Sequence, residues 1–234
     1  MKIALTGFAG AGKGLVAELI QEILKDKAPT KGSFAFPIKE FFRKLCNMTD
    51  QHLYGEFKEI PMTFIITPES FNEAAKFYMD YGLDNHVSFD RMWDRFVIVL
   101  QDNLNGVGKE GYWTLHSISS RRLQQLLGTE IIRHFKDTTW VDVALDNNYN
   151  IIDDLRFINE AKLLKEDGFL IVRVLGKDTR IEDETAKAHA SEQEIPLIAE
   201  DEILHNYFAS YDAESRASLK ARVVTMLFNN NLLI

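Results

Sequence analysis

Cysteine is nearly absent from this chain of 234 residues, in which Cys46 is the single one. One cysteine excludes an internal disulfide framework and a zinc site built from cysteines, so a reducing, cytoplasmic setting is expected. We expect Cys46 to be a small core residue rather than a catalytic thiol. The six histidines show no metal-ligand spacing, so no metal is assigned to them.

Basic residues are outnumbered, since 27 Lys and Arg stand against 35 Asp and Glu, a formal net charge of −8 at pH 7. This balance argues against broad binding of nucleic acid or of an anionic membrane, because both need a basic face. A signal-peptide pattern and an apolar run of about 18 residues are also lacking, so the chain is expected to be neither exported nor membrane-spanning. It has no repeats or low-complexity tracts, and its 46% hydrophobic content suits one compact globular domain.

What the chain does have is a glycine-rich segment between its first apolar run, Ile3-Ala4-Leu5, and residues 15–24, where apolar side chains recur at helical spacing. Strand, glycine loop, Lys13 and helix in this order are typical of a phosphate-binding loop (P-loop), whose N–H groups turn toward a phosphate while the lysine adds positive charge. A plain glycine turn is less favoured, because Lys13 would then stand at a helix start that disfavours cations. The residues expected to bind the nucleotide are Gly7, Gly10, Ala11, Gly12, Lys13 and Gly14.

Gly14 departs from the full phosphate-loop motif, which ends in a Ser or Thr whose hydroxyl ligates Mg²⁺. Two readings remain. Either the metal is held by phosphates, water and an acidic residue elsewhere, or the site binds nucleotide without turning it over.

Strand and helix patterns alternate along the chain, which predicts an α/β fold of the P-loop NTPase type with a parallel sheet flanked by helices. The core is expected over about 1–46 and 112–234. Residues 47–111 are rich in aromatics and turn signals and indicate a helical insertion. The charged segment 176–196 is either a solvated helix and loop or a mobile lid. Strands are expected over 3–5, 33–36, 149–152, 169–175 and 203–207, and helices over 15–24, 37–45, 67–81, 89–104, 121–135, 139–146, 157–166 and 212–227.

Phosphoryl transfer needs cations aimed at the transferring group, and three arginines are candidates to clamp an acceptor phosphate. Arg121 and Arg122 share a helix with Gln125 at a spacing of three and four residues, so these groups can share one face. Arg156 follows the strand pattern that ends at the two acids. The alternative for a pair of helix arginines is two surface charges, which the nearby glutamine and the phosphate loop make less favoured.

The acids at the end of this strand stand where open α/β sheets place their ligands. Asp154 can hold a Mg²⁺-bound water, whereas Asp153 is equally well a helix-capping or solvated acid. Trp93, Trp113 and Trp140 can stack on a base, although tryptophans are more often core residues.

Five segments occur in a fixed order over most of the chain: Gly7 to Lys13, Phe34 to Lys39, Arg121 to Glu130, Asp154 to Ala161 and His189 to Glu192. Together they resemble the motifs of bacteriophage deoxynucleoside-monophosphate (dNMP) kinases. The most specific part is the Arg-Arg-x-x-Gln-x-x-Gly-Thr helix followed by Trp140 and then Asp-x-Arg.

The resemblance implies ATP-dependent conversion of a dNMP to its diphosphate, with Mg²⁺, in the cytoplasm of an infected bacterium. It implies that the insertion forms the acceptor-binding lobe and that the stretch near Arg180 belongs to the lid, and it is compatible with a homodimer. The alternatives are a P-loop kinase for another small phosphate or alcohol and a nucleotide-binding regulatory protein without catalysis. The expected catalytic residues are Lys13, Arg121, Asp154 (also the metal ligand, through water), Arg156 and Arg180, and the expected substrate-binding residues are Lys39, Arg121, Arg122, Gln125, Trp140 and Arg156.

Overall fold

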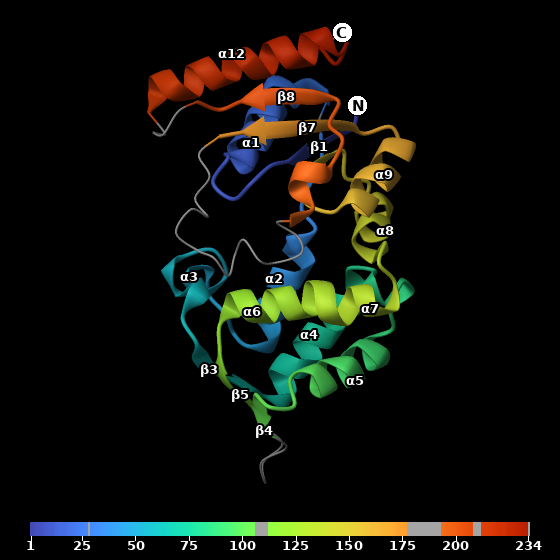
Figure 1. The fold of residues 1–234 in the computed structure, drawn as a ribbon. Coiled ribbons are helices and arrows are strands. Elements are labelled where there is room, and N and C mark those ends of the chain that lie inside the picture. The colour runs from blue at the N-terminus through green and yellow to red at the C-terminus, as the bar shows by residue number, and fades with distance from the viewer. Residues whose placement is uncertain (28, 106–111, 177–192, 208–211, 234) are drawn as a thin grey trace. The chain divides into compact units, whose positions relative to one another are not determined.

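The structure is a computed structural model that describes residues 1–27, 29–105, 112–176, 193–207 and 212–233 (Figure 1). Its backbone contacts divide the chain into two compact units. The first unit combines residues 1–34 with 147–234, and the second unit is residues 35–146. The insertion expected over 47–111 therefore lies inside a larger compact body.

The first unit is built on a five-stranded sheet with the order β2-β6-β1-β7-β8, in which every pairing is parallel. Its central strands are continuous apolar runs, as expected for strands buried on both faces. The expected α/β fold with a parallel sheet is confirmed. The strands are β1 (Ile3–Thr6), β2 (Lys31–Gly32), β6 (Ile151–Leu155), β7 (Leu170–Leu175) and β8 (Glu202–His205).

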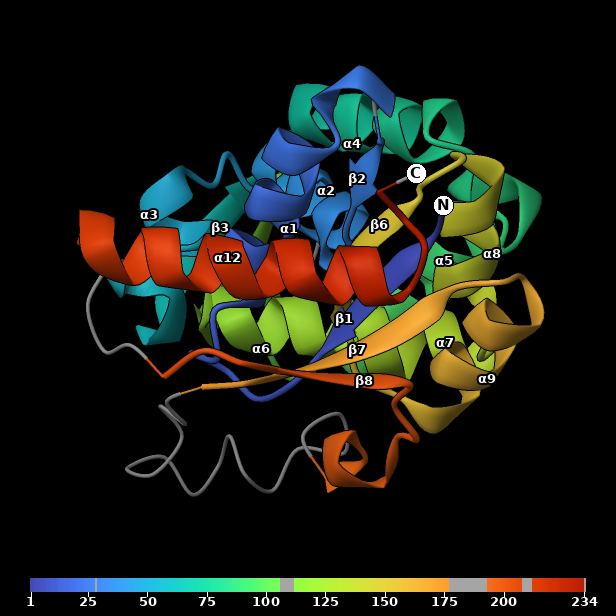
Figure 2. The ribbon, with the colours of Figure 1, turned by 90° about the horizontal axis from the view of Figure 1, so that it is seen from above.

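Helices cover both faces of this sheet. On one face lie α1 (Lys13–Ile23) and α12 (Ala213–Asn229), and on the other lies α9 (Ile158–Glu166) (Figure 2). In α12 the apolar spacing buries Leu219 and Val223 against the side chains of β1, β7 and α1. The described residues of this unit also form two short 3-10 turns, η1 (Lys25–Lys27) and η6 (Ile195–Leu197).

The second unit is mainly helical but carries a three-stranded antiparallel sheet of order β3-β5-β4. Its longest continuous helical stretch runs through α6, the π-helical segment η4 and α7, as the pattern over 121–135 predicts. Ser119 caps this stretch by accepting a hydrogen bond from the Arg122 amide. The elements are α2 (Ala35–Leu45), α3 (Asp50–Leu53), η2 (Glu56–Glu59), β3 (Met62–Ile66), α4 (Pro68–Asp80), η3 (Leu83–Asn85), α5 (Phe89–Val99), β4 (Leu104–Asn105), β5 (Trp113–Ile118), α6 (Ser120–Gln125), η4 (Leu126–Ile132), α7 (Arg133–Phe135) and α8 (Thr139–Asp146).

Two expected elements are wrong. The strand over 33–36 does not form, because the Phe34 amide bonds to the Asp154 carboxylate and α2 begins at Ala35. The helix expected over 89–104 ends at Val99, since Leu104 pairs with Leu115 in the second sheet. The sheet itself went unpredicted because β3 buries only alternate side chains among many aromatic residues.

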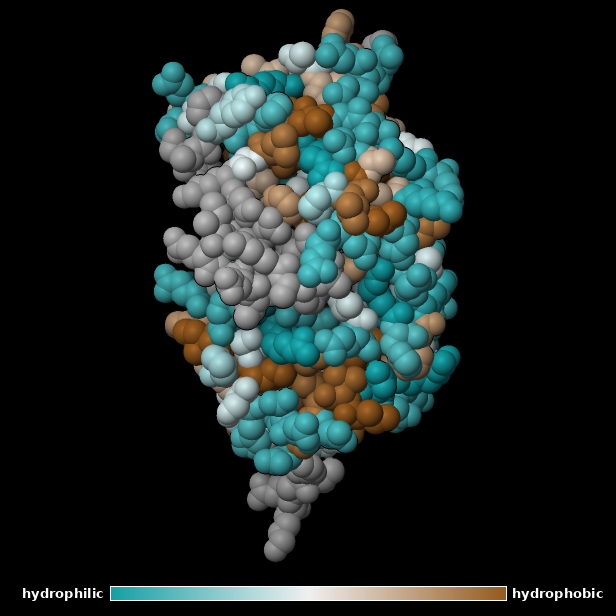
Figure 3. Space-filling view, viewed as in Figure 1, coloured by the Kyte–Doolittle hydropathy of each residue, from teal (hydrophilic) through white to brown (hydrophobic). Residues whose placement is uncertain are grey.

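On the face seen in Figure 3, hydrophilic side chains predominate and hydrophobic ones form small separate groups. Exposed apolar residues of this kind are normal on a protein surface. No helix among the described residues is both long and apolar enough to cross a membrane.

Candidate functional site

The glycine-rich loop links β1 to α1 at the carboxyl edge of the parallel sheet. Its glycines adopt positive φ values that other residues rarely reach, +139° at Gly7, +82° at Gly10 and +89° at Gly12. A Cβ at Gly7 would also lie 2.4 Å from the carbonyl oxygen of Val174 in β7. The loop therefore requires glycine for its conformation and for its close approach to the neighbouring strand.

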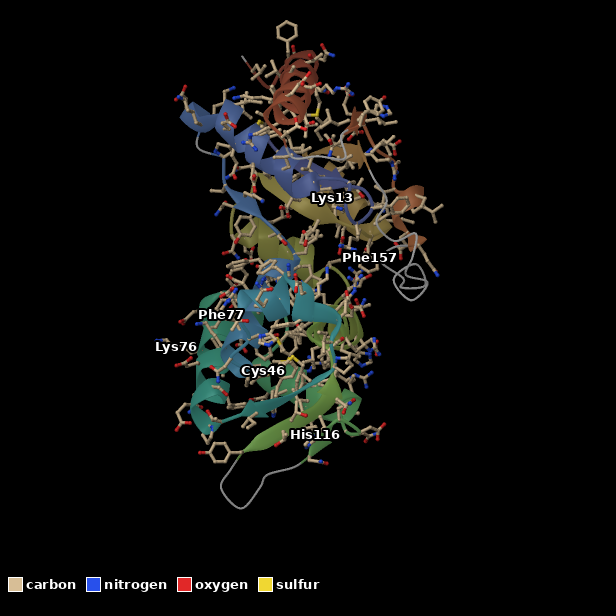
Figure 4. All side chains as sticks on the ribbon, turned by 90° about the vertical axis from the view of Figure 1, so that its left-hand side faces the viewer. Lys13, Cys46, Lys76, Phe77, His116 and Phe157 are labelled. Carbon is tan, nitrogen blue, oxygen red and sulfur yellow. The ribbon has the colours of Figure 1, made fainter. Side chains whose placement is uncertain are left out.

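Lys13 is the first residue of α1, directly after the loop (Figure 4). Its Nζ donates hydrogen bonds to the carbonyl oxygens of Gly7 at 2.6 Å and Phe8 at 3.0 Å. The ammonium is therefore folded back over the loop. A cation in this position, beside loop N–H groups at a helix N-terminus, has the chemistry that an anionic phosphate chain requires.

Asp153 and Asp154 lie in β6, the strand next to β1. Asp154 accepts hydrogen bonds from the Ser33 hydroxyl and the Phe34 amide, both at 2.8 Å. Asp153 pairs with the Lys31 ammonium at 2.9 Å. The expectation that Asp153 caps a helix or is solvated is therefore wrong.

Burial raises the pKa of Asp153, and the adjacent charge of Asp154 raises it further, while Lys31 and Lys13 act in the opposite direction. Asp154 is oriented by two neutral donors, so the two neighbouring acids have different surroundings.

The raised pKa makes a prediction about Asp153→Asn. The pKa of Asp153 in the folded protein lies above the ordinary value of 3.8. The contribution of Asp153 to the free energy of unfolding is therefore fully present below pH 3.8, and it is lost as the pH rises through the raised pKa. Asn does not titrate, so the variant does not lose stability in this way. The difference in the free energy of unfolding, variant minus native protein, should therefore increase with pH across this window. Urea unfolding at several pH values between about 3.5 and 7 measures the difference. Asp167→Asn, at the exposed ion pair with Lys2, is the control for loss of an ion pair, and an unchanged difference across the range would contradict the prediction.

Arg156 follows β6 and leads into α9, whose N-terminus carries two carboxylates. Glu160, only 3% exposed, accepts hydrogen bonds from the amides of Arg156 (3.2 Å) and Phe157 (3.1 Å). Glu194 accepts one from the Ile158 amide at 2.9 Å. These hydrogen bonds fix the backbone from which Arg156 projects. Phe157, the next residue, is labelled in Figure 4. Sequence reasoning missed Glu160, although a glutamate at the third position of a helix is the signal of a capping box.

Three further candidate cations, Lys39, Arg121 and Arg122, belong to the second unit, where α6 packs against α2, α3 and η2. Lys39 in α2 places its Nζ 3.9 Å from the ring centroid of Tyr54. Arg121 pairs with Glu59 at 3.0 Å, and Arg122 pairs with Glu130 at 2.9 Å. Arg121 is therefore held by a carboxylate of η2, and Arg122 by one of η4. Gln125 is the last residue of α6.

Trp140 in α8 is 5% exposed, and its indole N–H donates to the carbonyl oxygen of Gly128 at 2.9 Å. This contact favours the core alternative over base stacking. Cys46 is confirmed as a buried residue, and burial raises the pKa of its thiol. Trp140 and Cys46 are therefore both buried residues of the second unit.

Two positions after the last strands of the first sheet were not singled out from the sequence. A Cβ at Gly176 would lie 2.6 Å from the carbonyl oxygen of Ala11, and Asn206 donates from Nδ2 to the same oxygen at 3.0 Å. Both follow parallel strands, so they reach the edge where the phosphate loop lies. No local pattern marks them, because only the packing of β7 and β8 brings them to the loop.

Arg180 and most of the expected lid, residues 177–192, lie outside the described residues. Within the described ranges, no group of three or more His, Cys, Asp and Glu is placed to hold a metal ion.

No protein-family model matches the chain. The chain is similar to the deoxynucleoside-5′-monophosphate kinase of Escherichia phage T5, with 32% identity over 216 residues. The match spans 83% of this chain and 84% of the phage T5 protein.

Proposed function

The chain belongs to the deoxynucleoside-5′-monophosphate kinase family, and we propose on this premise that it transfers the γ-phosphoryl group of ATP to a dNMP, giving ADP and the dNDP. The observation that carries the proposal is the phosphate loop with Lys13 folded over it, in a chain 32% identical to the phage T5 enzyme.

On the donor side, the phosphate chain of ATP binds to the loop. The N–H groups of Gly12 to Gly14 at the N-terminus of α1 receive the anionic oxygens, and Lys13 exchanges its loop carbonyl partners for the β- and γ-phosphates. Once ATP is bound, the loop N–H groups and the Lys13 ammonium stabilise the charge that shifts during transfer.

On the acceptor side, we assign the monophosphate to Lys39, Arg121, Arg122 and Gln125 of the second unit, as the family motifs imply. Arg156 of the first unit is proposed separately as a cation for the transfer. Guanidinium groups suit this task because they bind phosphate through two parallel hydrogen bonds. An oxygen of the acceptor phosphate attacks the γ-phosphorus in line, and the bond from γ-phosphorus to the β-γ bridging oxygen of ATP breaks. The attacking oxygen is already anionic, so no general base is needed. Arg180 is proposed as a further cation for the transferring group.

Mg²⁺ fits the donors at the end of β6, because carboxylate oxygens are its preferred protein ligands and Asp154 is oriented by two neutral donors. Asp154 would hold it, through water, and Asp153 is less suited since it pairs with Lys31. When bound, the ion neutralises charge on the β- and γ-phosphates.

Replacing Gly14 by serine tests how the ion is held. An added Cβ meets no heavy atom within 4 Å, so the side chain is accommodated, and loss of a helical glycine should stabilise the fold by about 0.5–1 kcal/mol. The new hydroxyl should lower the Mg²⁺ concentration for half-maximal rate by about an order of magnitude. Gly14→Ala is the matched control, because it also removes the helical glycine but adds no hydroxyl. Equal Mg²⁺ dependence of the two variants would show that position 14 does not face the ion.

The proposed function is tested by ADP release from Mg·ATP in the presence of each of the four dNMPs. Turnover that depends on one or more dNMPs supports the kinase and gives its base range. ATP binding without acceptor-stimulated turnover favours the regulatory alternative, for which Gly14 is the direct sequence argument. Turnover with a nucleoside or another small phosphate instead would point to the other kinase class.

We further propose that the partners are small nucleotides rather than nucleic acid, that the enzyme acts in the host cytoplasm and that it forms a homodimer. Light scattering coupled to size-exclusion chromatography tests the dimer directly.

A further inference from the structure

We propose that Asn206 is a positioning residue, which fixes the direction of the Gly12 N–H in the phosphate loop and thereby the affinity for the phosphate chain of the donor. The inference rests on the proposed function only for its kinetic readout. Its binding readout is independent of turnover.

The place of Asn206 is set by the sheet. It follows β8 directly, and its backbone N–H donates to the carbonyl oxygen of Leu175 at 2.6 Å, extending the pairing of β7 with β8. From this fixed backbone the side-chain Nδ2 reaches the carbonyl oxygen of Ala11 at 3.0 Å. The contact spans 195 positions in sequence, so it ties the last strand of the sheet to its first loop.

A peptide unit then converts this contact into an orientation. The chain contains no cis peptide among its described residues, and in a trans peptide the C=O of one residue and the N–H of the next point in opposite directions. With the Ala11 oxygen held toward Asn206, the Gly12 N–H must point away from it. Gly12 is the N-cap of α1, so this N–H belongs to the group that a helix leaves without an intrahelical acceptor and that binds anions.

The space around Gly12 and Ala11 supports the same conclusion. A Cβ on Gly12 would lie 2.4 Å from Nδ2 of Asn206, so glycine at 12 and asparagine at 206 are a matched pair. On another side, Gly176 approaches the Ala11 oxygen so closely that a Cβ there would lie 2.6 Å from it. The carbonyl is enclosed by β7 and Asn206. Without the amide donor, the peptide between Ala11 and Gly12 can adopt other orientations. Part of the binding free energy of the anion is then used to restore the correct orientation, so the affinity falls.

The test compares Asn206→Leu, which has similar size and shape but no donor, with Asn230→Leu. Asn230 is the matched control, since its side-chain Nδ2 is likewise a donor in the first unit, to Glu202 and to the Met226 carbonyl, away from the loop. Calorimetric titration without acceptor uses ATP and inorganic tripolyphosphate as probes. We expect Asn206→Leu to weaken both by the same factor, about five- to tenfold, and Asn230→Leu to weaken neither. In turnover, KM for ATP should rise while KM for the dNMP changes less than about twofold.

Three results would overturn the proposal. Weakened ATP binding with unchanged tripolyphosphate binding would place Asn206 at the base or ribose. Unchanged affinity for both probes, or an equal loss in Asn230→Leu, would leave Asn206 a structural residue. If Asn206→Leu does not fold, Asn206→Asp takes its place, because aspartate keeps the size and replaces the donor by an acceptor. Asn206→Asp must then weaken tripolyphosphate binding by at least about fivefold. A wild-type protein without kinase turnover would refute the proposed function but leave these titrations decisive for Asn206.

Discussion

Replacing Lys13 by methionine is expected to lower kcat by about a thousandfold, as loss of a preorganised charge at the transferring group commonly does. Methionine keeps much of the length and apolar volume of the side chain but lacks the ammonium that bonds to the Gly7 and Phe8 carbonyls. Stability should fall far less, by about 1 kcal/mol, because the polar contacts of Lys13 with the loop carbonyls are made at a partly buried position.

The measurement is kcat at saturating ATP and dNMP, together with the melting temperature of the same preparation. Lys220→Met is the control, since Lys220 is bound to Glu22 at the surface. A Lys13 variant that keeps more than a tenth of the native kcat would remove the lysine from the proposed mechanism.

The second large effect is expected at Arg121. Its replacement by alanine should lower kcat/KM for the dNMP by about a hundredfold, because a charge-assisted contact to the acceptor phosphate is lost. Kinetics at varied dNMP and fixed saturating ATP measure it.

Two variants separate this role from that of an ordinary ion pair. Arg216→Ala removes a pair of the same length, 3.0 Å to Glu22, on the surface of the first unit and should leave kcat/KM unchanged. Glu59→Gln releases Arg121 from its partner while keeping the guanidinium, so it should retain or improve acceptor binding. Equal losses in Arg121→Ala and Glu59→Gln would show that the pair acts structurally.

The parts of this site that could be predicted from sequence are local in origin. The loop from Gly7 to Lys13 is recognisable because strand, turn and helix follow one another within a few residues, and each imposes its own residue pattern. The extent of α8 was predictable for the same reason.

The parts that could not be predicted depend on distant partners. Phe34 looked like a strand residue because its neighbours are apolar, yet its amide is used by an acid 120 positions away. Asp153 looked solvated because its ammonium partner, Lys31, lies on another strand. The role we propose for Asn206 depends wholly on strand order, since β8 lies at the sheet edge and meets the loop only after β7 is in place.

The two units also differ in the chromophores that they carry. All three tryptophans, Trp93, Trp113 and Trp140, and the single thiol of Cys46 fall within residues 35–146, and the first unit has neither. Tryptophan fluorescence and thiol labelling of the unaltered chain therefore report the second unit alone, whereas far-ultraviolet circular dichroism records both. Denaturation followed by these signals in parallel shows whether the units melt together, and a tryptophan introduced into the first unit would make its response to ATP directly visible.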